Sequence, residues 1–542
     1  MSDPNHLSQH ISHLIEIGLA LSSEKNSHVL LDRIVESAQV LTKANGGTLY
    51  LVRDNSLHFA VMRTNSHRAG GQAQEEPSPP PIPLYLEDEV PNTNTVATCA
   101  AVSGVTLNID DMSGMPEFDF SGALKYERAS GEHSKSFLAI PLTNHENDVI
   151  GVLQLINAQH PETGEVIPFS GEAQRLAESL ASQAAISLTN QQLLFDLRNL
   201  LEKFIGVIAD AIDEKSPYTG SHCRRVPEIA MLLADAVNAT QKGRHRDTRF
   251  NDDELYEIKI AAMLHDYGKI TTPVHVVDKA TKLEAIFDRI HLIEGRFEIL
   301  KRDLEIALLK QRLAERGEVD VDVRHCHQFQ AQLARLDDDF AFLKKCNLGS
   351  EFMSEQDRQR VAQISQLTWQ NHRGKPQPML DENEHYNLTI AKGTLTQEER
   401  TEINAHVLTT IRMLEALPFP KNLRNVPEIA GGHHERIDGN GYPKGLTGEQ
   451  MSVQARLMCI ADIFEALTAT DRPYKKAMSL SQTLTILGNM ALEGHIDPDL
   501  FAVFVEEGVY LRYAERFLAP EQIDEVDLSS LPGLTNLRHT GT

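Results

Sequence analysis

The first two hundred residues change from helical to strand-like hydrophobic spacing and back. Apolar side chains recur every three or four positions in LSQHISHLIEIGLALSS and VLLDRIVESAQVLTKA, which predicts two amphipathic helices. Shorter stretches with strand-like patterns follow: TLYLVR, LHFAVMR, SFLAIPLTN and DVIGVLQLINA. A helical pattern without proline then runs from 172 to 215. The order predicts an α+β sensor-like module, an antiparallel sheet with helices on one face.

The pattern from about residue 200 to 520 is almost wholly helical. One part stands apart, because residues 280–370 combine apolar positions at helical spacing with dense mixed charge. We interpret this stretch as a helical hairpin inserted into a second, all-α domain. Its charges are typical of a solvated helix face rather than of a binding patch.

Composition narrows the classes of function. A chain of 542 residues exceeds one ordinary core, so two to four domains are expected. It has no apolar run of membrane-spanning length, and MSDPNHLSQHISHL lacks the features of a signal peptide, so no membrane anchor is expected. Five scattered cysteines favour a reducing cytoplasm. The net charge of −25 argues against broad binding to nucleic acid polymers or anionic membranes.

Histidine and aspartate gather on a few helix-like segments. These residues are His222, His265, Asp266, His406, His433, His434 and Asp462, with Lys269 one turn after Asp266. A single histidine on an apolar helix is more often a hydrogen-bonded core residue than a metal ligand. A carboxylate inside an apolar run, however, costs several kcal/mol unless it is paired or bound to metal. Imidazole and carboxylate donors suit Mn, Fe, Zn or Ni, and one aspartate between two ions is the usual arrangement for two-metal hydrolysis.

The N-terminal module resembles a GAF domain over about residues 10–190. The features that carry the resemblance are VSGVTLNIDD, SFLAIPLTNHENDVIGVLQLINA and LASQAAISLTNQQLL. GAF domains that bind cyclic nucleotides have an Asn-Lys pair, a Phe and an Asp-Glu pair in this region. Here Asn157 is followed by Ala158, and no Asp-Glu pair follows Phe169. We therefore expect a dimerising sensor module whose ligand is unknown or absent.

The helical part resembles the HD-GYP family of phosphohydrolases. LHDYGKI and HHERIDGNGYPKGL carry the resemblance, together with RPYKKA and HIDPDLF, over about residues 205–275 and 393–515. Members hydrolyse cyclic di-GMP at a bi- or trinuclear metal centre on a helical bundle. The resemblance thus implies hydrolysis to linear pGpG, with further cleavage to GMP left open. Another cyclic dinucleotide such as cyclic GMP-AMP, or a non-catalytic cyclic di-GMP receptor, remains an alternative.

The same resemblance assigns roles to individual residues. It implies that Asp266 bridges two ions, Fe or Mn, and that Lys269 acts on the scissile phosphate or the leaving group. The other implied metal ligands are His222, His265, His406, His433, His434 and Asp462. Implied substrate contacts come from Arg472 and Lys475 at the second phosphate and from the turn of Gly441, Tyr442 and Pro443, which Asp438 and Gly439 begin. His406 is preferred over His291 as a ligand, and Tyr218, where trinuclear members have Glu, favours a binuclear site.

These interpretations give a domain plan. We expect a GAF-like sensor over 1–190, a connecting signalling helix over 191–215, an HD-GYP domain over 205–520 with a helical insertion at 280–390, and a tail at 521–542. The connecting helix carries apolar residues that can pair with their copies. We therefore expect a homodimer, formed through the GAF domains and connecting helices, that passes a change in the sensor to the metal site.

Overall fold

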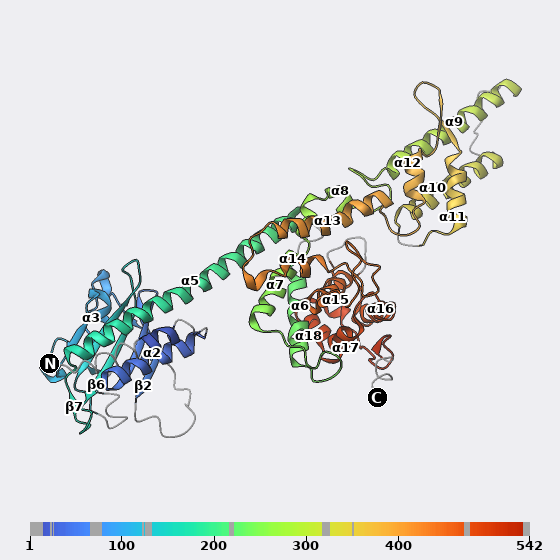
Figure 1. Cartoon of the computed structure of the whole chain (residues 1–542). Coiled ribbons are helices and arrows are strands. Elements are labelled where there is room, and N and C mark those ends of the chain that lie inside the picture. The colour runs from blue at the N-terminus through green and yellow to red at the C-terminus, as the bar shows by residue number, and fades with distance from the viewer. Residues whose placement is uncertain are drawn as a thin grey trace. The chain divides into compact units, whose positions relative to one another are not determined.

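A computed structural model describes residues 15–21, 24, 26–64, 79–121, 124, 133–215, 222–316, 326–349, 352–470 and 477–534. The chain divides into two compact units, Met1–Leu200 and Leu201–Thr542 (Figure 1). None of the helices in these described ranges is long and apolar enough to cross a membrane.

The N-terminal unit is built on an antiparallel sheet with the strand order β3-β2-β1-β6-β5-β4, and β7 pairs with β6. The strands are β1 (Ala44–Arg53), β2 (Ser56–Thr64), β3 (Ile82–Pro83), β4 (Leu107–Ile109), β5 (Phe137–Thr143), β6 (Val149–Gln159) and β7 (Val166–Ile167). Helix α2 (Ser27–Thr42) begins at Asn26, whose side chain accepts hydrogen bonds from the amides of His28 and Val29. The predicted α+β sensor fold is confirmed.

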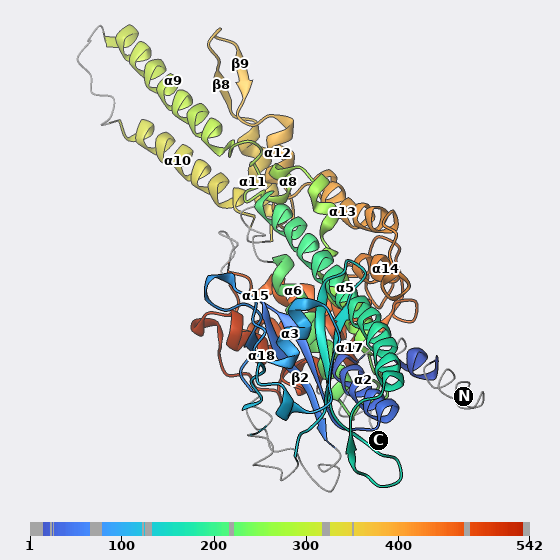
Figure 2. The ribbon, with the colours of Figure 1, turned by 90° about the vertical axis from the view of Figure 1, so that its left-hand side faces the viewer.

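Both faces of this sheet are covered. Side chains alternate along β1, so that Leu49 packs in one core with α2 and the start of α5, while Tyr50 packs in the other with α3 (Val96–Ser103). The sequence had predicted helices on one face, because the short α3 segment carries no amphipathic stripe. Figure 2 shows α2 and α5 beside the sheet.

Helix α5 (Gly171–Lys215) is a single helix of 45 residues. Its first half contributes Ala177, Leu180 and Ala181 to the core of the N-terminal unit. Further along, large apolar side chains are exposed: Leu193, Leu194, Phe195, Leu197, Leu200, Phe204 and Val207. Exposed large apolar side chains in such number on one helix are uncommon on the surface of a monomeric protein.

The C-terminal unit is a helical bundle around one large apolar core. Its elements are α6 (His222–Ala239), α7 (Asp252–Leu264), η4 (Tyr267–Thr271), α8 (Val274–Val277), α13 (Gln397–Glu415), η6 (Lys421–Leu423), α14 (Val426–Gly431), α15 (Val453–Thr468), α16 (Leu480–Leu492), α17 (Pro498–Glu506), α18 (Val509–Phe517) and η7 (Pro520–Gln522). The predicted all-α domain is confirmed. Its buried side chains come from α6, α7, α14 and α15, which carry or flank the histidine-rich segments, and from α16, α17 and α18.

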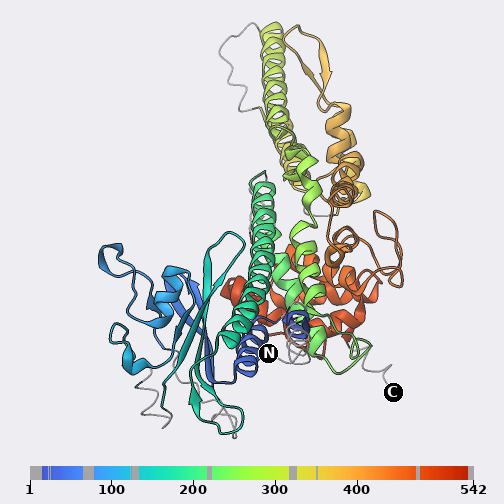
Figure 3. The ribbon, with the colours of Figure 1, turned by 60° about the vertical axis from the view of Figure 1, so that its left-hand side comes forward.

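The inserted segment has a core of its own between α8 and α13. It comprises α9 (Ile290–Arg316), α10 (His327–Asn347), α11 (Glu355–Ser365), β8 (Thr368–Gln370), β9 (Pro376–Pro378) and α12 (Glu382–Leu388). Helices α9 and α10 lie side by side (Figure 2), and Figure 3 shows the segment from another direction. The helical hairpin was predicted, but the β8–β9 hairpin was not. At the neck, Lys279 Nζ lies 2.9 Å from Asn387 Oδ1 and 2.8 Å from both carboxylate oxygens of Glu399.

Candidate metal centre

The bundle brings together side chains from five segments of the chain. His222 is the first residue of α6, His265 and Asp266 follow α7, His406 lies on α13, His433 and His434 follow α14, and Asp462 lies on α15. Three groups have ligand atoms that all lie within 4.8 Å of one another: His406, His433 and His434; His222, His265 and Asp462; and His265, Asp266 and His433. Each ligand implied by the sequence falls in one of these groups.

Asp266 lies between two sets of imidazoles. Its Oδ2 is 3.3 Å from His222 Nε2 and 3.4 Å from His265 Nε2. Its Oδ1 is 3.3 Å from His406 Nε2 and 4.0 Å from His433 Nε2. The two oxygens of one carboxylate therefore face different histidines, which is the geometry that a bridging ligand requires.

Three of the histidines are oriented by their own helices. His265 donates from Nδ1 to the carbonyl of Ala262 at 2.8 Å, and His433 donates to Ala430 at 2.6 Å. His406 makes the same contact three residues back, to Ile403, at 2.5 Å. Because a carbonyl can only accept, Nδ1 carries the proton and the Nε2 lone pair is directed into the centre. Metal-binding histidines are commonly fixed in this way.

His222 is oriented by a carboxylate instead. Its Nδ1 pairs with Glu465, whose other oxygen accepts from Arg225 Nε at 2.6 Å. Glu465 is 1% exposed, so its carboxylate is shielded from water. The sequence interpretation missed Glu465. The available signal was its position three residues after Asp462, on the same face of an apolar helix.

The electrostatics of the centre favour a cation. Burial alone would raise the pKa of Asp266, but Lys269 and His265 hold it well below its usual range. Burial lowers the pKa of His434 to about 4, so this imidazole stays neutral and can offer a lone pair. Burial would lower the pKa of His265 too, but the charge of Asp266 raises it to about 9. Without a metal, the carboxylate of Asp266 is thus ionised, His434 is neutral, and His265 holds a second proton that a bound divalent cation would displace.

Three of the donor atoms have no hydrogen-bond partner among the described residues. Among the residues that the structure describes, Asp266 Oδ1, His406 Nε2 and His433 Nε2 are buried acceptors without a hydrogen-bond partner. Buried acceptors in this state are costly, and a bound cation would satisfy all three. The residues present therefore fit a metal centre.

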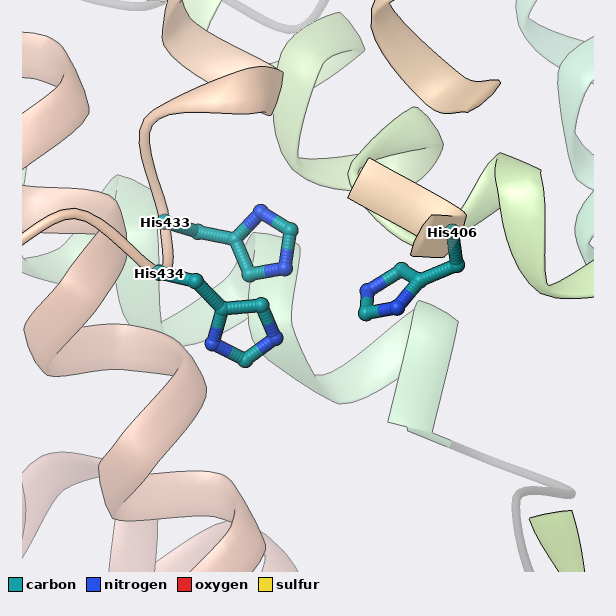
Figure 4. Close-up of side chains that lie close together, drawn as sticks. All are labelled: His406, His433 and His434. Atoms are coloured by element: carbon teal, nitrogen blue, oxygen red, sulfur yellow. The ribbon is translucent and has the colours of Figure 1, made fainter. Parts of the chain in front are cut away.

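A tight turn closes one side of the centre. The rings of His433 and His434 lie side by side, with their centroids 4.1 Å apart (Figure 4), and Tyr442 stacks on His434 at 4.8 Å. Glu435, 1% exposed, holds the turn by accepting from the amides of Lys444 at 2.7 Å and Leu446 at 2.9 Å. A side chain at Gly441 would come within 2.3 Å of the backbone nitrogen of Arg436, so this position requires glycine.

The remaining residues of the turn have structural contacts. Asp438 forms an ion pair with Arg436, in which Oδ2 lies 2.7 Å from Nη2. The carboxylate of Asp438 also accepts a hydrogen bond from the backbone amide of Asn440. Gly439 has a φ of 80°, which favours glycine. The peptide bond between Tyr442 and Pro443 is cis. The predicted turn of Gly441, Tyr442 and Pro443 thus lies directly beside the histidine pair.

Other predicted positions lie elsewhere. Arg472, Lys475 and Tyr218 are outside the described residues. His291, the competitor of His406, lies on α9, where its side chain is 74% exposed and its Nδ1 is 3.5 Å from Glu294.

Comparisons with known proteins agree with this architecture. A GAF domain model matches residues 26–188, and two HD domain models match residues 219–335 and 383–500. The 3'3'-cGAMP-specific phosphodiesterase 3 of Vibrio cholerae is 40% identical over 20% of this chain and 23% of its own length. The cyclic di-GMP phosphodiesterase PA4108 of Pseudomonas aeruginosa is 38% identical over 22% and 28%. The cyclic di-GMP phosphodiesterase response regulator RpfG of Xanthomonas campestris is 35% identical over 18% and 26%.

This chain thus spans about a quarter of the length of these curated relatives. The matched models nevertheless cover both structural units, the first with a GAF domain and the second with two HD domain matches, of which one ends and the other begins within the insertion. The chain therefore carries a GAF domain and an HD domain, as its sequence had predicted by resemblance. The curated relatives of this chain are phosphodiesterases of the HD-GYP type.

Proposed function

We propose that this chain is a metal-dependent phosphodiesterase that hydrolyses cyclic di-GMP to linear pGpG. The observation that carries the proposal is the position of Asp266, whose two oxygens face two different sets of histidines. This arrangement suits a pair of divalent cations, Fe or Mn, because both accept imidazole and carboxylate ligands. Bound in this way, the cations would lower the pKa of a water molecule and neutralise charge on the phosphate.

The ligands fall into two sets around Asp266. His222, His265 and Asp462 would hold one cation, and His406, His433 and His434 would hold the other. Glu465 keeps the ring of His222 in place from behind. The buried ligands also exclude bulk water from most of the centre, which strengthens the electrostatic interactions within it.

Lys269 is the proposed proton donor or phosphate contact. Its Nζ lies 2.5 Å from Asp266 Oδ2, and its side chain keeps 22% of its surface exposed. Burial would lower the pKa of Lys269, but Asp266 raises it, so the side chain stays cationic. A cationic donor at the edge of the centre can bind a phosphate oxygen or protonate a leaving group. Arg472 and Lys475 would bind the second phosphate, and the turn of Gly441, Tyr442 and Pro443 would contact the substrate.

The test combines metal analysis with turnover. The full-length chain is purified without oxygen, its metal content per chain is measured, and hydrolysis is followed with Fe(II) or Mn(II) supplied. Two metals per chain with conversion of cyclic di-GMP to pGpG are expected. Three metals would overturn the binuclear proposal but not the reaction. Bound metal without turnover of any cyclic dinucleotide would refute the proposed enzymatic activity and favour a non-catalytic cyclic di-GMP receptor.

A second substrate is favoured by one comparison. The relative that is 40% identical to this chain is named as specific for 3'3'-cGAMP, so cyclic GMP-AMP is the alternative substrate. The cations that these side chains would hold act on phosphate groups, which both dinucleotides share. The ratio of kcat/KM for the two substrates, measured in the same preparation, decides between them.

Regulation by the GAF domain is proposed to pass through α5. The exposed residues Leu193, Leu197, Leu200, Phe204 and Val207 recur at alternating spacings of four and three. This heptad spacing is typical of a two-stranded coiled coil. We therefore assign the surface to a second copy of the chain, giving a homodimer in which the paired helices transmit a change in the sensor. The oligomeric state in solution, measured by light scattering, tests this assignment.

A further inference from the structure

Asp266 sits in a break between two helical segments. Helix α7 ends at Leu264, and the 3-10 helix η4 begins at Tyr267. Asp266 itself has φ −98° and ψ 11°, outside helical geometry. Such a break leaves backbone groups at the end of one helix and the start of the next without intrahelical partners. The orientation of the bridging carboxylate therefore depends on what holds this break.

One hydroxyl group spans the break from a neighbouring helix. Thr410 lies on α13, one turn after His406, and is fully buried. Its Oγ1 accepts a hydrogen bond from the amide of Gly268 at 2.8 Å and donates to the carbonyl of His265 at 3.2 Å. These two backbone groups lie on opposite sides of Asp266. A threonine inside a helix often bonds the carbonyl one turn back, whereas this one bonds the neighbouring segment.

The two segments approach each other as closely as backbones can. A side-chain carbon at Gly268 would lie 2.0 Å from the carbonyl oxygen of His406 and 2.8 Å from the amide nitrogen of Thr410. Glycine at this position therefore lets η4 rest directly on α13, beside a proposed ligand. The hydroxyl of Thr410 then fixes how far the segment carrying Asp266 and Lys269 can slide along that helix.

We propose that Thr410 is a positioning residue that sets the spacing between the two halves of the metal centre. It aligns the His265–Asp266 segment with His406, so that Asp266 Oδ1 lies 3.3 Å from His406 Nε2. This inference rests on the proposed function, because it assumes the same metal centre. Its test, however, measures metal affinity and needs no substrate. Outer partners that orient metal ligands typically change affinity roughly 10- to 100-fold when they are removed.

The test compares three variants of the full-length chain. Thr410→Val keeps the shape but removes the hydroxyl, and Thr410→Ser keeps the hydroxyl but removes the methyl group. Thr483→Val is the matched control, because Thr483 is equally buried and its hydroxyl has no hydrogen-bond partner among the described residues. Free Mn²⁺ is counted by electron paramagnetic resonance during titration of the metal-free proteins, and thermal unfolding is recorded beside it.

We expect Thr410→Val to weaken Mn²⁺ binding by a factor of roughly 10 or more, and Thr410→Ser to stay within about threefold of wild type. Wild-type affinity in Thr410→Val would overturn the proposal. Equal losses in the Val and Ser variants would overturn it too, because packing of the methyl group would then be responsible. If Thr410→Val does not fold, Thr410→Ala is the second variant without a hydroxyl. Normal Mn²⁺ binding without dinucleotide turnover in wild type would refute the proposed function alone.

Discussion

Replacing Glu465 with glutamine tests whether a side chain that touches no substrate controls the metal centre. In the native chain, one carboxylate oxygen pairs with His222 Nδ1 and the other accepts from Arg225 Nε. A glutamine side chain has a single acceptor oxygen for these two donors. One of the donors must therefore face the NH2 group, and the other keeps only a hydrogen bond to a neutral amide oxygen, so the contacts of His222 and Arg225 with residue 465 are both weakened.

The expected magnitudes follow from this geometry. Loss of an outer partner of a metal-binding histidine costs roughly 10- to 100-fold in metal affinity, or about 1.4–2.7 kcal/mol. Arg225 keeps 17% of its side chain exposed, so weakening its hydrogen bond to the buried carboxylate of Glu465 should lower the free energy of unfolding by about 1–3 kcal/mol. Both losses are expected in Glu465→Gln, whereas only the second would appear if Glu465 were merely structural.

The assay is a metal titration of the metal-free protein alongside chemical unfolding. Glu257→Gln is the matched control, since Glu257 is 3% exposed and accepts from the backbone nitrogen of Asn425 at 2.7 Å and from its Nδ2 at 3.1 Å. The control should lose stability but keep wild-type metal affinity. Unchanged affinity in Glu465→Gln, with or without a loss of stability, would refute the role of this carboxylate in orienting His222.

Three further predictions concern the ligands, the close contact and α5. Asp266→Ala should abolish metal binding and turnover together, as measured by metal analysis and product formation; retained activity would contradict the bridging role. Gly268→Ala should lower the free energy of unfolding by about 1–3 kcal/mol, because its new methyl group meets the backbone of α13, while Gly295→Ala, which faces open space, should not destabilise the chain. Leu200→Asp should convert a dimer to monomers in sedimentation experiments, and a dimer that survives would place the interface elsewhere.

The sequence could single out the candidate ligands because their residue types are rare inside apolar helices, and the family resemblance then implied the role of each. Asp266 and Asp462 would be costly to bury without a partner, and a carboxylate within an apolar stretch can be recognised from the sequence alone. Thr410 gives no such signal, since a threonine in a helix is ordinary and its partners are backbone groups more than a hundred residues away. Only tertiary packing places its hydroxyl beside Gly268.

For the fold, too, local features could be predicted from the sequence, whereas features that depend on tertiary packing could not. The alternating strands and the long helices were predicted from periodicity, which depends only on neighbours along the chain. The segments that the sequence did not predict are short: β8 has three residues and α3 has eight. Elements of this length have little periodicity, and their conformation is decided by the sheet or hairpin on which they pack.

The buried neck at Lys279 has a consequence for how this architecture can change. Its contacts with Asn387 and Glu399 join the two points where the chain leaves and re-enters the HD bundle. Whatever lies between them is a closed loop, and doubling the length of a loop costs only about 0.6 kcal/mol of chain entropy. The insertion can thus be enlarged, exchanged or lost over generations while the distance from Asp266 to His406 stays fixed. The length of the insertion and the geometry of the bundle can therefore change independently of each other.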